Sequence, residues 1–377
     1  MEGYNISICD RCGSGYASDV PPQSVFDRYY GEMSKYERSQ DAGRLSVIDK
    51  DRYRQIADLV APRLRTDDTI IDVGCATGAL LAEFKCRGFG NVLGVDPSMA
   101  CAATGQRLYG IPIRCMTGSR LSEIPERFDL AMLTGVLEHL CDVDASLKLI
   151  LGLLKPGGQI YIEVPDATHY TEWFSAPYQF FSMEHVNYFS PLSLANLMLR
   201  LGLKAEFVER VPRWLGPNAA EPAIAGLFRR DPHAHKNILD FDWETEAALK
   251  AYICTSARLE ERIHLLIDEI VRSQVPLVVW GTGTHTLRLL ETSSLPKANL
   301  VAFLDSNLRY QGKRLNGIPI LNPSDWRDPA ATILISSHVA EKEIKDQILT
   351  SLKWPNRVVS LYEGISAYAS AFKENIP

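Results

Sequence analysis

Two acids and two glycines at fixed spacing are the residues of this chain best suited to binding a nucleoside. Asp72 lies at the end of an apolar run that leads into a turn containing Gly74 and Gly78, and Asp96 closes a second apolar run 18 residues after Gly78. Glycines let the backbone approach a ligand closely, and an acid after the second strand of a βαβ unit accepts hydrogen bonds from ribose hydroxyls. The pattern therefore predicts a nucleoside site in which Asp96 binds the ribose.

The spacing of the glycines indicates which nucleoside. Gly74 and Gly78 form G-x-x-x-G, whereas a dinucleotide pyrophosphate is held by G-x-G-x-x-G. A loop of this kind suits a nucleoside with an uncharged linker, such as S-adenosylmethionine (SAM). Thr117, Gly118 and Ser119 follow the third expected strand, and we expect them to flank the adenine.

Two further groups of residues could carry out proton transfer. Gly135 and His139 follow the fourth expected strand, and ligands of open α/β sheets bind outside the carboxyl ends of the strands. Glu184 and His185 lie in an aromatic-rich loop after the fifth strand. Histidine has a pKa near neutrality, which suits a general base. Each histidine could instead be structural, and Asp72 could instead cap a helix.

The elements that position these residues follow from the hydrophobic pattern. Between residues 66 and 210, apolar runs alternate with helical patterns, which predicts an α/β, doubly wound and mostly parallel Rossmann-like sheet. The expected strands are 69–73, 91–95, 111–117, 130–133, 159–164 and 204–209, and the expected helices are 79–87, 99–109, 145–154 and 192–201.

Residues 1–65 are expected to form a small N-terminal cap. Cys9 and Cys12 form a C-x-x-C-G knuckle, which is half of a structural zinc site because such sites take four ligands. Zinc is therefore not expected, and no residue is predicted as a metal ligand. An aromatic-rich segment containing Tyr36 follows, and the helix 52–64 leads into the first strand.

The second half of the chain begins with a Pro-rich linker and a long charged helix over 211–274, the helix spanning 242–272. Residues 275–377 are expected to form a second, C-terminal Rossmann-like domain, with strands at 275–280, 299–305 and 332–337. Its glycine turn runs from Gly281 to His285, with Thr286 at the third glycine position, which disfavours a nicotinamide dinucleotide there.

Composition excludes several classes of function. The formal net charge is −6, the pI is about 5.8 and no long basic run occurs, so nucleic acid is not expected as a partner. No apolar stretch is long enough for a membrane span, and the N-terminus does not resemble a signal peptide. We therefore expect a cytoplasmic protein with a small-molecule substrate. The sequence leaves self-association open.

Residues 66–166 resemble class I SAM-dependent methyltransferases. The resemblance rests on four blocks in the expected order: 72–78, Asp96, 128–139 and 154–164. It implies a SAM-binding fold in which Asp72 helps to orient the methionine end of the cofactor.

Nearly the whole chain also resembles a narrower family, the sugar C-methyltransferases that act on nucleotide-linked keto deoxysugars. This resemblance implies that Glu184 and His185 supply the base, assisted by His139 and by an N-terminal tyrosine that Tyr36 matches best. Two positions depart from the pattern: Ser182 stands where that family has a tyrosine, and the segment 221–226 replaces a Gly-Gly-Ser turn. Both are expected near the acceptor.

Three functions remain open on the sequence. The first is C-methylation of a nucleotide-linked keto sugar, for which a carbon next to a carbonyl must lose a proton to His185. The second is O-methylation of a sugar or other polar metabolite, with the same base. The third is a SAM-binding protein without catalysis, against which the intact Glu184, His185 and His139 argue.

Overall fold

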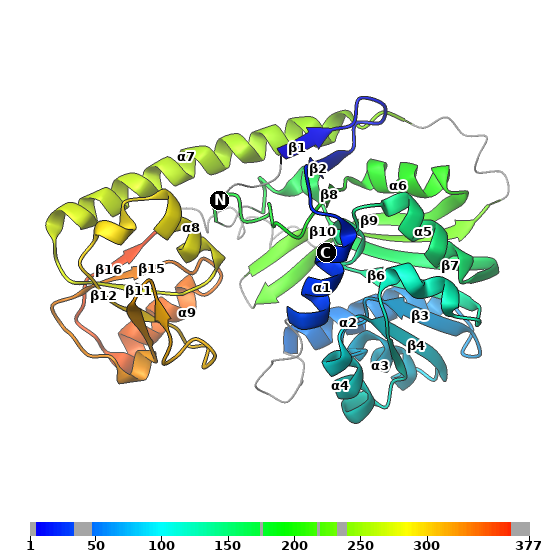
Figure 1. Ribbon diagram of the computed structural model, residues 1–377, viewed down its shortest axis with the longest axis horizontal. Helices are drawn as coiled ribbons and strands as arrows, with labels where there is room; N and C mark the ends of the chain where they lie inside the picture. The colour runs from blue at the N-terminus through cyan, green and yellow to red at the C-terminus, as the bar shows by residue number, and fades with distance from the viewer. Residues whose placement is uncertain (1–4, 34–46, 174–175, 217–218, 232–239, 363–377) are drawn as a thin grey trace. The chain divides into compact units, whose positions relative to one another are not determined.

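The computed structural model describes residues 5–33, 47–173, 176–216, 219–231 and 240–362. The chain divides into two compact units (Figure 1). The larger unit contains residues 3–170 and 182–249, and the smaller unit contains residues 1–2, 171–181 and 250–377. Each unit is built around its own central sheet.

The larger unit contains a seven-stranded sheet in the order β5-β4-β3-β6-β7-β10-β9. The first five strands of that order pair in parallel, and β10 pairs antiparallel with both β7 and β9. The strands are β3 (Thr69–Val73), β4 (Asn91–Asp96), β5 (Ile113–Cys115), β6 (Phe128–Thr134), β7 (Leu154–Pro165), β9 (Leu203–Gly216) and β10 (Ala219–Arg230). The predicted α/β sheet is confirmed.

Helices cover both faces of this sheet. They are α2 (Val47–Val60), α3 (Ala79–Cys86), α4 (Met99–Tyr109), α5 (Val143–Gly152) and α6 (Pro191–Arg200). Neighbouring residues of one strand alternate between two cores: Ile70 packs with α2 and α3, whereas Ile71 packs with α5 and α6. The near-continuous apolar runs of the central strands follow from this double burial.

The Pro-rich stretch after residue 210 is a hairpin rather than a linker. β9 and β10 pair along their length, and Pro212 lies opposite Pro222. Proline removes a backbone donor, so it is tolerated on an edge strand such as β9 or where a ladder ends. Pro222 sits just before the β7 ladder, which begins at the pair Ala223–Pro165. The linker expected here is therefore a pair of strands, because proline is permitted at these two positions.

Other boundaries moved by a few residues, for local reasons. The helix expected over 52–64 is α2, which ends at Val60 and continues as a short 3-10 turn, Ala61–Arg63, that contains Pro62. α6 begins where a serine and a proline predicted it, because the Ser190 side chain accepts from the Ser193 backbone N–H in a capping box.

A three-stranded sheet joins the N-terminus to the loop that carries Glu184 and His185. It has the order β1-β2-β8, with β1 (Asn5–Ile8), β2 (Gly15–Ser18) and β8 (Asn187–Tyr188), and β2 pairs antiparallel with β8. Cys9 and Cys12 lie in the β1–β2 turn as free thiols. The helix α1 (Gln23–Met33) follows this sheet.

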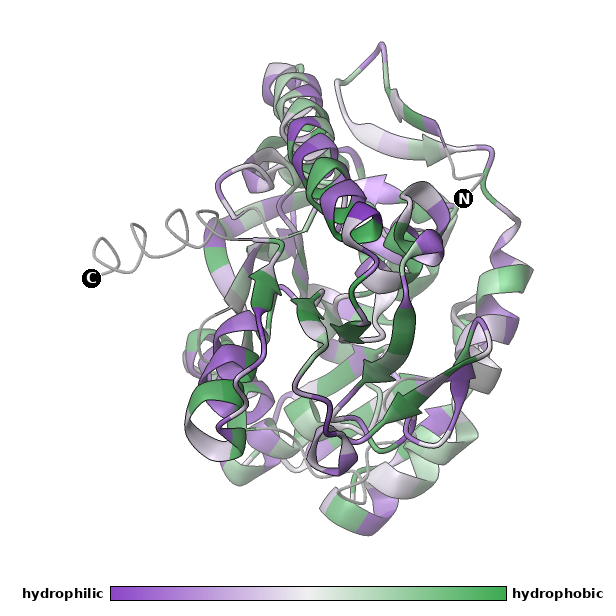
Figure 2. Cartoon of the chain, turned by 90° about the vertical axis from the view of Figure 1, so that its left-hand side faces the viewer, coloured by the Kyte–Doolittle hydropathy of each residue, from purple (hydrophilic) through white to green (hydrophobic). Residues whose placement is uncertain are grey.

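The smaller unit contains a mixed six-stranded sheet in the order β13-β14-β12-β11-β15-β16. Its strands are β11 (Leu277–Trp280), β12 (Leu300–Leu304), β13 (Arg314–Leu315), β14 (Ile318–Leu321), β15 (Thr332–Ile335) and β16 (Val358–Ser360). The helices are α7 (Trp243–Ser273), which starts in the larger unit, α8 (Thr284–Thr292) and α9 (Glu341–Asp346). Green segments mark the hydrophobic residues of these strands (Figure 2).

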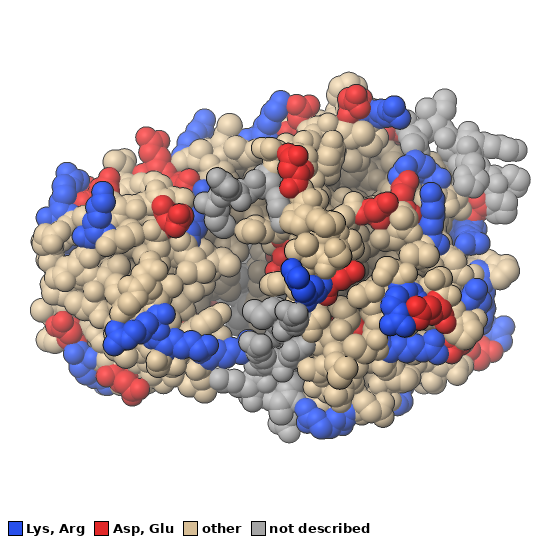
Figure 3. Space-filling model, viewed as in Figure 1, with Lys and Arg blue, Asp and Glu red and all other residues tan. Residues whose placement is uncertain are grey.

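The face shown in Figure 3 carries charges of both signs, with basic and acidic side chains interspersed. Within the described ranges, no helix is both long and apolar enough to cross a membrane.

Candidate active site

The turn between β3 and α3 has the left-handed backbone that its glycines predict. Gly74 and Gly78 have φ of 78° and 73°. Asp96, at the end of β4, holds this turn in place: its Oδ2 accepts from the Ala76 backbone N–H at 2.8 Å. Its Oδ1 accepts from the Ser98 N–H at 2.9 Å. Asp96 therefore lies beside the glycine turn, where a ribose acceptor is expected.

Asp72 is a buried carboxylate beside the same turn. Its side chain is 1% exposed, and Oδ1 has no hydrogen-bond partner among the described residues. Burial, together with the nearby charge of Asp96, raises the pKa of Asp72 to about 7, although Arg52 opposes this rise. α3 has Gly78 at its N-cap and no side-chain cap, so Asp72 does not cap it. An acidic oxygen without a partner suits a cationic ligand such as SAM.

The predicted adenine residues lie at the end of β5. The backbone N–H of Met116 donates to the Asp96 carbonyl, which ties this loop to the end of β4. The hydroxyls of Thr117 and Ser119 lie 2.8 Å apart, and a Cβ added at Gly118 would meet nothing within 4 Å. Gly118 is therefore exposed, and nothing in the described residues covers it.

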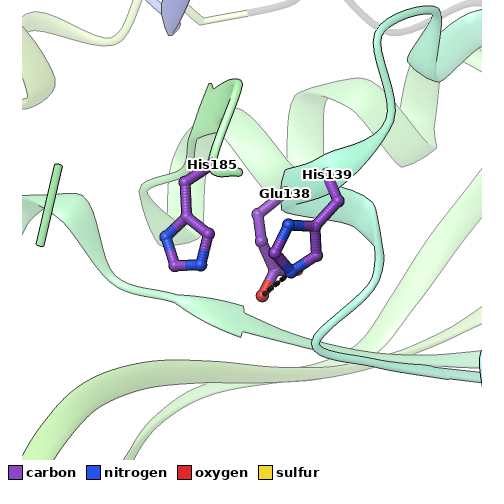
Figure 4. Close-up of side chains that lie close together, drawn as sticks. All are labelled: Glu138, His139 and His185. Carbon is purple, nitrogen blue, oxygen red and sulfur yellow. Dashed lines mark ion pairs between the residues drawn. The ribbon is translucent and has the colours of Figure 1, made fainter. Parts of the chain in front are cut away.

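A second cluster lies at the end of β6. Gly135, with φ of 70°, leads into a short 3-10 turn, Leu137–His139. Glu138 is 1% exposed, and its Oε1 lies 3.7 Å from His139 Nε2. The rings of His139 and His185 lie edge to face with centroids 4.9 Å apart (Figure 4). The structure thus brings together two histidines that are 46 positions apart in the sequence.

Two tyrosines of α1 bind the carboxylate of Glu184. Tyr29 donates to Oε1 at 3.0 Å, and Tyr30 donates to Oε2 at 3.1 Å. The Tyr30 hydroxyl also lies 3.0 Å from His139 Nδ1, which in turn lies 2.8 Å from the Glu184 carbonyl oxygen. Burial and the Glu184 charge raise the pKa of Tyr30 far above its usual value, so this tyrosine remains a donor at neutral pH.

Tyr29, Tyr30 and Glu138 are not among the residues that the sequence predicts. The resemblance implies Tyr36 of the same aromatic-rich segment, and Tyr36 lies outside the described residues. Only the docking of α1 against the loop of Glu184 distinguishes these tyrosines. The signal for Glu138 was its place beside His139 at the end of a strand.

One ion pair of the described residues borders the cluster. Arg213 on β9 pairs with Glu221 on β10 at 3.2 Å, and both side chains are mostly buried. A Cβ added at Gly135 would lie 3.7 Å from Arg213 Nη1 and 3.6 Å from Glu138 Oε1, so the guanidinium borders the site. The segment 221–226, where the chain departs from the sugar-enzyme pattern, is therefore part of β10, and its first residue, Glu221, pairs with Arg213 beside the cluster.

Comparison with known proteins identifies the central part of the chain. A methyltransferase-domain family model matches residues 48–206. Ubiquinone biosynthesis O-methyltransferase of Rhizobium etli is 32% identical over 116 residues, which are 29% of this chain and 46% of that protein. The Rhizobium rhizogenes protein of the same name is 34% identical over 104 residues, 26% of this chain and 42% of that protein. The chain thus spans less than half the length of these relatives.

Solved structures of methyltransferases resemble the chain at low sequence identity. The 1,6-didemethyltoxoflavin-N1-methyltransferase of Burkholderia thailandensis, solved with S-adenosylhomocysteine, is 21% identical and covers 60% of this chain and 99% of its own, with a TM-score of 0.43. Magnesium protoporphyrin IX methyltransferase of Synechocystis is 11% identical and covers 55% of this chain and 99% of its own, with a TM-score of 0.42.

The family model and the curated relatives confirm the predicted class. Residues 48–206 form a class I SAM-dependent methyltransferase domain, and SAM is its cofactor. The glycine turn, Asp96 and the unpartnered oxygen of Asp72 fit this cofactor.

Proposed function

Because the chain contains a SAM-dependent methyltransferase domain, we propose that it transfers a methyl group to a polar small molecule, in the first instance to a carbon of a nucleotide-linked keto sugar. One observation carries the proposal: Glu184, His185 and His139 are assembled at the carboxyl edge of the sheet that also holds Asp96. Acceptors of open α/β sheets bind outside that edge.

His185 is the proposed base. Bound SAM supplies an electrophilic methyl group on a positively charged sulfur, so the chain must mainly position and deprotonate the acceptor. His185 takes the proton from a carbon next to the carbonyl. The electron pair left on that carbon forms the new carbon–carbon bond as the methyl–sulfur bond breaks. Such a carbon is acidic enough only because the charge moves to the carbonyl oxygen.

Hydrogen-bond donors near His185 would stabilise that oxygen. His139 is the nearest candidate when its ring is doubly protonated, because Tyr30 and Glu184 already occupy Nδ1 and the donor must then be Nε2. The resemblance to sugar C-methyltransferases adds Tyr36 as a donor. Tyr29 and Tyr30 hold the Glu184 carboxylate, which keeps the loop of His185 in place.

O-methylation of a sugar or another polar metabolite is the second candidate. It is favoured by the names of the curated relatives, which are ubiquinone biosynthesis O-methyltransferases. In this reaction His185 would take the proton of a hydroxyl group, and no keto group is needed. The two candidates share the base and differ in the acceptor atom.

Product analysis separates the two candidates. The chain is mixed with SAM and a panel of nucleotide-linked sugars, keto and non-keto, with deuterium at the carbon next to the carbonyl. A gain of one methyl group with loss of deuterium supports C-methylation, and a gain with deuterium retained supports O-methylation. Tight SAM binding without methylation of any sugar would contradict the sugar proposal.

A variant pair tests the base. His185→Ala should abolish turnover while SAM still binds, because the glycine turn and Asp96 are unchanged. His264→Ala, on α7 of the smaller unit, is the matched control and should turn over normally. Normal turnover by His185→Ala would remove His185 from the mechanism.

A further inference from the structure

Three side chains at the end of β6 have the composition of a metal site. The donor atoms of Glu138, His139 and His185 all lie within 4.8 Å of one another (Figure 4), and no other such group of three occurs in the part of the chain that the structure describes. Two imidazoles and one carboxylate form the ligand set of many catalytic metal sites, in which the remaining positions are open to water or substrate.

Glu138 is a buried carboxylate that makes no hydrogen bond within the described residues. Its side chain is 1% exposed, and within the described residues neither oxygen has a hydrogen-bond partner. Burying a charged group without a partner is costly, so such a group normally faces a cation or a donor. Figure 4 shows the carboxylate directed toward the ring of His139, whose Nε2 lies 3.7 Å from Oε1.

The ring of His139 is oriented as a metal ligand would be. Its Nδ1 lies 2.8 Å from the Glu184 carbonyl oxygen, which can only accept, so Nδ1 carries the hydrogen. In the neutral ring, Nε2 then has a free electron pair, and this atom faces Glu138. A backbone carbonyl that fixes the distal nitrogen is the usual outer contact of a metal-bound histidine.

The charged residues next to the cluster are paired with other residues, so a cation could bind at Glu138. Arg213 is the nearest guanidinium on the side of Gly135, but it pairs with Glu221 at 3.2 Å. The carboxylate of Glu184 is held by Tyr29 and Tyr30. Of the carboxylates of Glu138, Glu184 and Glu221, only that of Glu138 receives no partner from these contacts.

We infer that Glu138, His139 and His185 bind one divalent first-row transition-metal ion. The role of the ion rests on the proposed methyl transfer: it would hold an acceptor oxygen and lower the pKa of a hydroxyl there. The hydroxyl proton passes to solvent, the oxygen forms the bond to the methyl group, and the methyl–sulfur bond breaks. His185 cannot be ligand and base at once, so the metal-bound chain fits O-methylation, the second candidate above.

Cobalt(II) alone is a direct probe of the site. Added to the metal-free full chain, it should bind at one ion per chain and give ligand-field absorption of nitrogen and oxygen ligands. A thiolate charge-transfer band would instead place the ion at cysteines such as Cys9 and Cys12 and would overturn the assignment. Absence of binding would also overturn it.

Variants locate the ion. Glu138→Gln should weaken cobalt(II) binding at least about 100-fold. Loss of a direct ligand should cost more affinity than loss of an outer contact, which costs roughly 10- to 100-fold. His139→Ala should do the same, and retained SAM binding shows that each variant is folded. Glu123→Gln, at an exposed carboxylate, is the matched control and should bind normally. Equal affinity in Glu138→Gln and the unsubstituted chain would refute the site.

Cobalt(II) binding and methyl transfer are measured separately, so that the metal site and the proposed function can fail independently. Cobalt(II) binding at this cluster without methylation of any acceptor would uphold the metal site and contradict the proposed function. Methylation that proceeds in chelator, by a chain that binds no cobalt(II), would uphold the proposed function and contradict the metal site.

Discussion

The hydroxyl of Tyr30 lies 3.1 Å from Glu184 Oε2 and joins α1 to a loop 154 residues later in the chain. The same hydroxyl lies 3.0 Å from His139 Nδ1. One side chain of the N-terminal helix therefore links the loop after β7 to the turn after β6. α1 therefore helps to hold the candidate catalytic residues in position.

Tyr30→Phe should lower kcat by about 10- to 100-fold and leave SAM affinity unchanged. A hydrogen bond to a charged group is worth about 1.5–3 kcal/mol, and its loss frees both Glu184 and His139. Steady-state kinetics with separate kcat and KM values is the measurement. Because Tyr30 acts through other residues, the pH profile of kcat should also change.

Two other tyrosines serve as controls for this prediction. Tyr29→Phe removes only the bond to Glu184 Oε1, so its effect on kcat should be smaller. Tyr36→Phe tests the tyrosine that the sugar-enzyme resemblance implies. A large loss in Tyr36→Phe with none in Tyr30→Phe would show that the α1 contact is only structural.

Asp96→Ala should weaken SAM binding by at least about 100-fold. It removes the expected ribose acceptor, with hydrogen bonds of about 1.5–3 kcal/mol each, and also the contacts that hold Ala76 and Ser98. Isothermal titration with SAM measures the change. Unchanged affinity would exclude Asp96 as the ribose ligand.

The smaller unit offers a matched control for this variant. Asp305 follows β12 as Asp96 ends β4: its Oδ2 accepts from the Thr282 N–H at 3.0 Å and its Oδ1 from the Asn307 N–H at 2.8 Å. Asp305→Ala therefore disturbs a turn of the same design in the other unit. Its SAM affinity should equal that of the unsubstituted chain, and a loss would contradict the assignment of SAM to the larger unit.

The sequence was most informative where local chemistry decides the structure. The first glycine turn and Asp96 could be predicted, because a tight turn needs φ values that only glycine adopts easily and because the acid follows directly after an apolar strand. The strands β3 and β4 and the helix α4 lie within one residue of the predicted ranges.

Contacts between distant segments were not accessible in the same way. The pairing of β10 with β7 places residues 223–229 against 159–165, and no local pattern encodes such a partner. The contact between Tyr30 and Glu184 could not be predicted for the same reason, because it depends on where α1 docks. Apart from its place beside His139, Glu138 has no local feature that distinguishes a buried carboxylate from a surface one.

SAM affinity should rise with pH up to about 7 and then level off. Asp72 has a pKa of about 7 because it is buried and lies near Asp96, so below that value it is mostly protonated. The cationic ligand favours the ionised form, and binding at lower pH must first release the proton. The dissociation constant should therefore increase by up to about tenfold for each pH unit below 7.

Asp72→Asn isolates this effect. The variant should bind SAM more weakly at pH 8, and its affinity should no longer vary between pH 5.5 and 7. Titration calorimetry in two buffers of different ionisation enthalpy also counts the released proton. A pH dependence that persists in Asp72→Asn would assign it to another group.

The stability of the smaller unit should fall as the pH drops from about 6.5 to about 4. His285 is 8% exposed, neither ring nitrogen has a hydrogen-bond partner within the described residues, and burial, with Arg288 and His338, lowers its pKa to about 4. In that window the unfolded chain binds a proton that the folded unit does not, which costs about 3 kcal/mol of unfolding free energy.

Urea unfolding at a series of pH values should show this slope, and His285→Asn should flatten it even if it lowers stability at every pH. His264→Asn, a substitution on α7 of the same unit, should change the slope only slightly, because His264 is the smallest of the contributions that lower the pKa of His285. An unchanged slope in His285→Asn would assign the acid sensitivity to other groups.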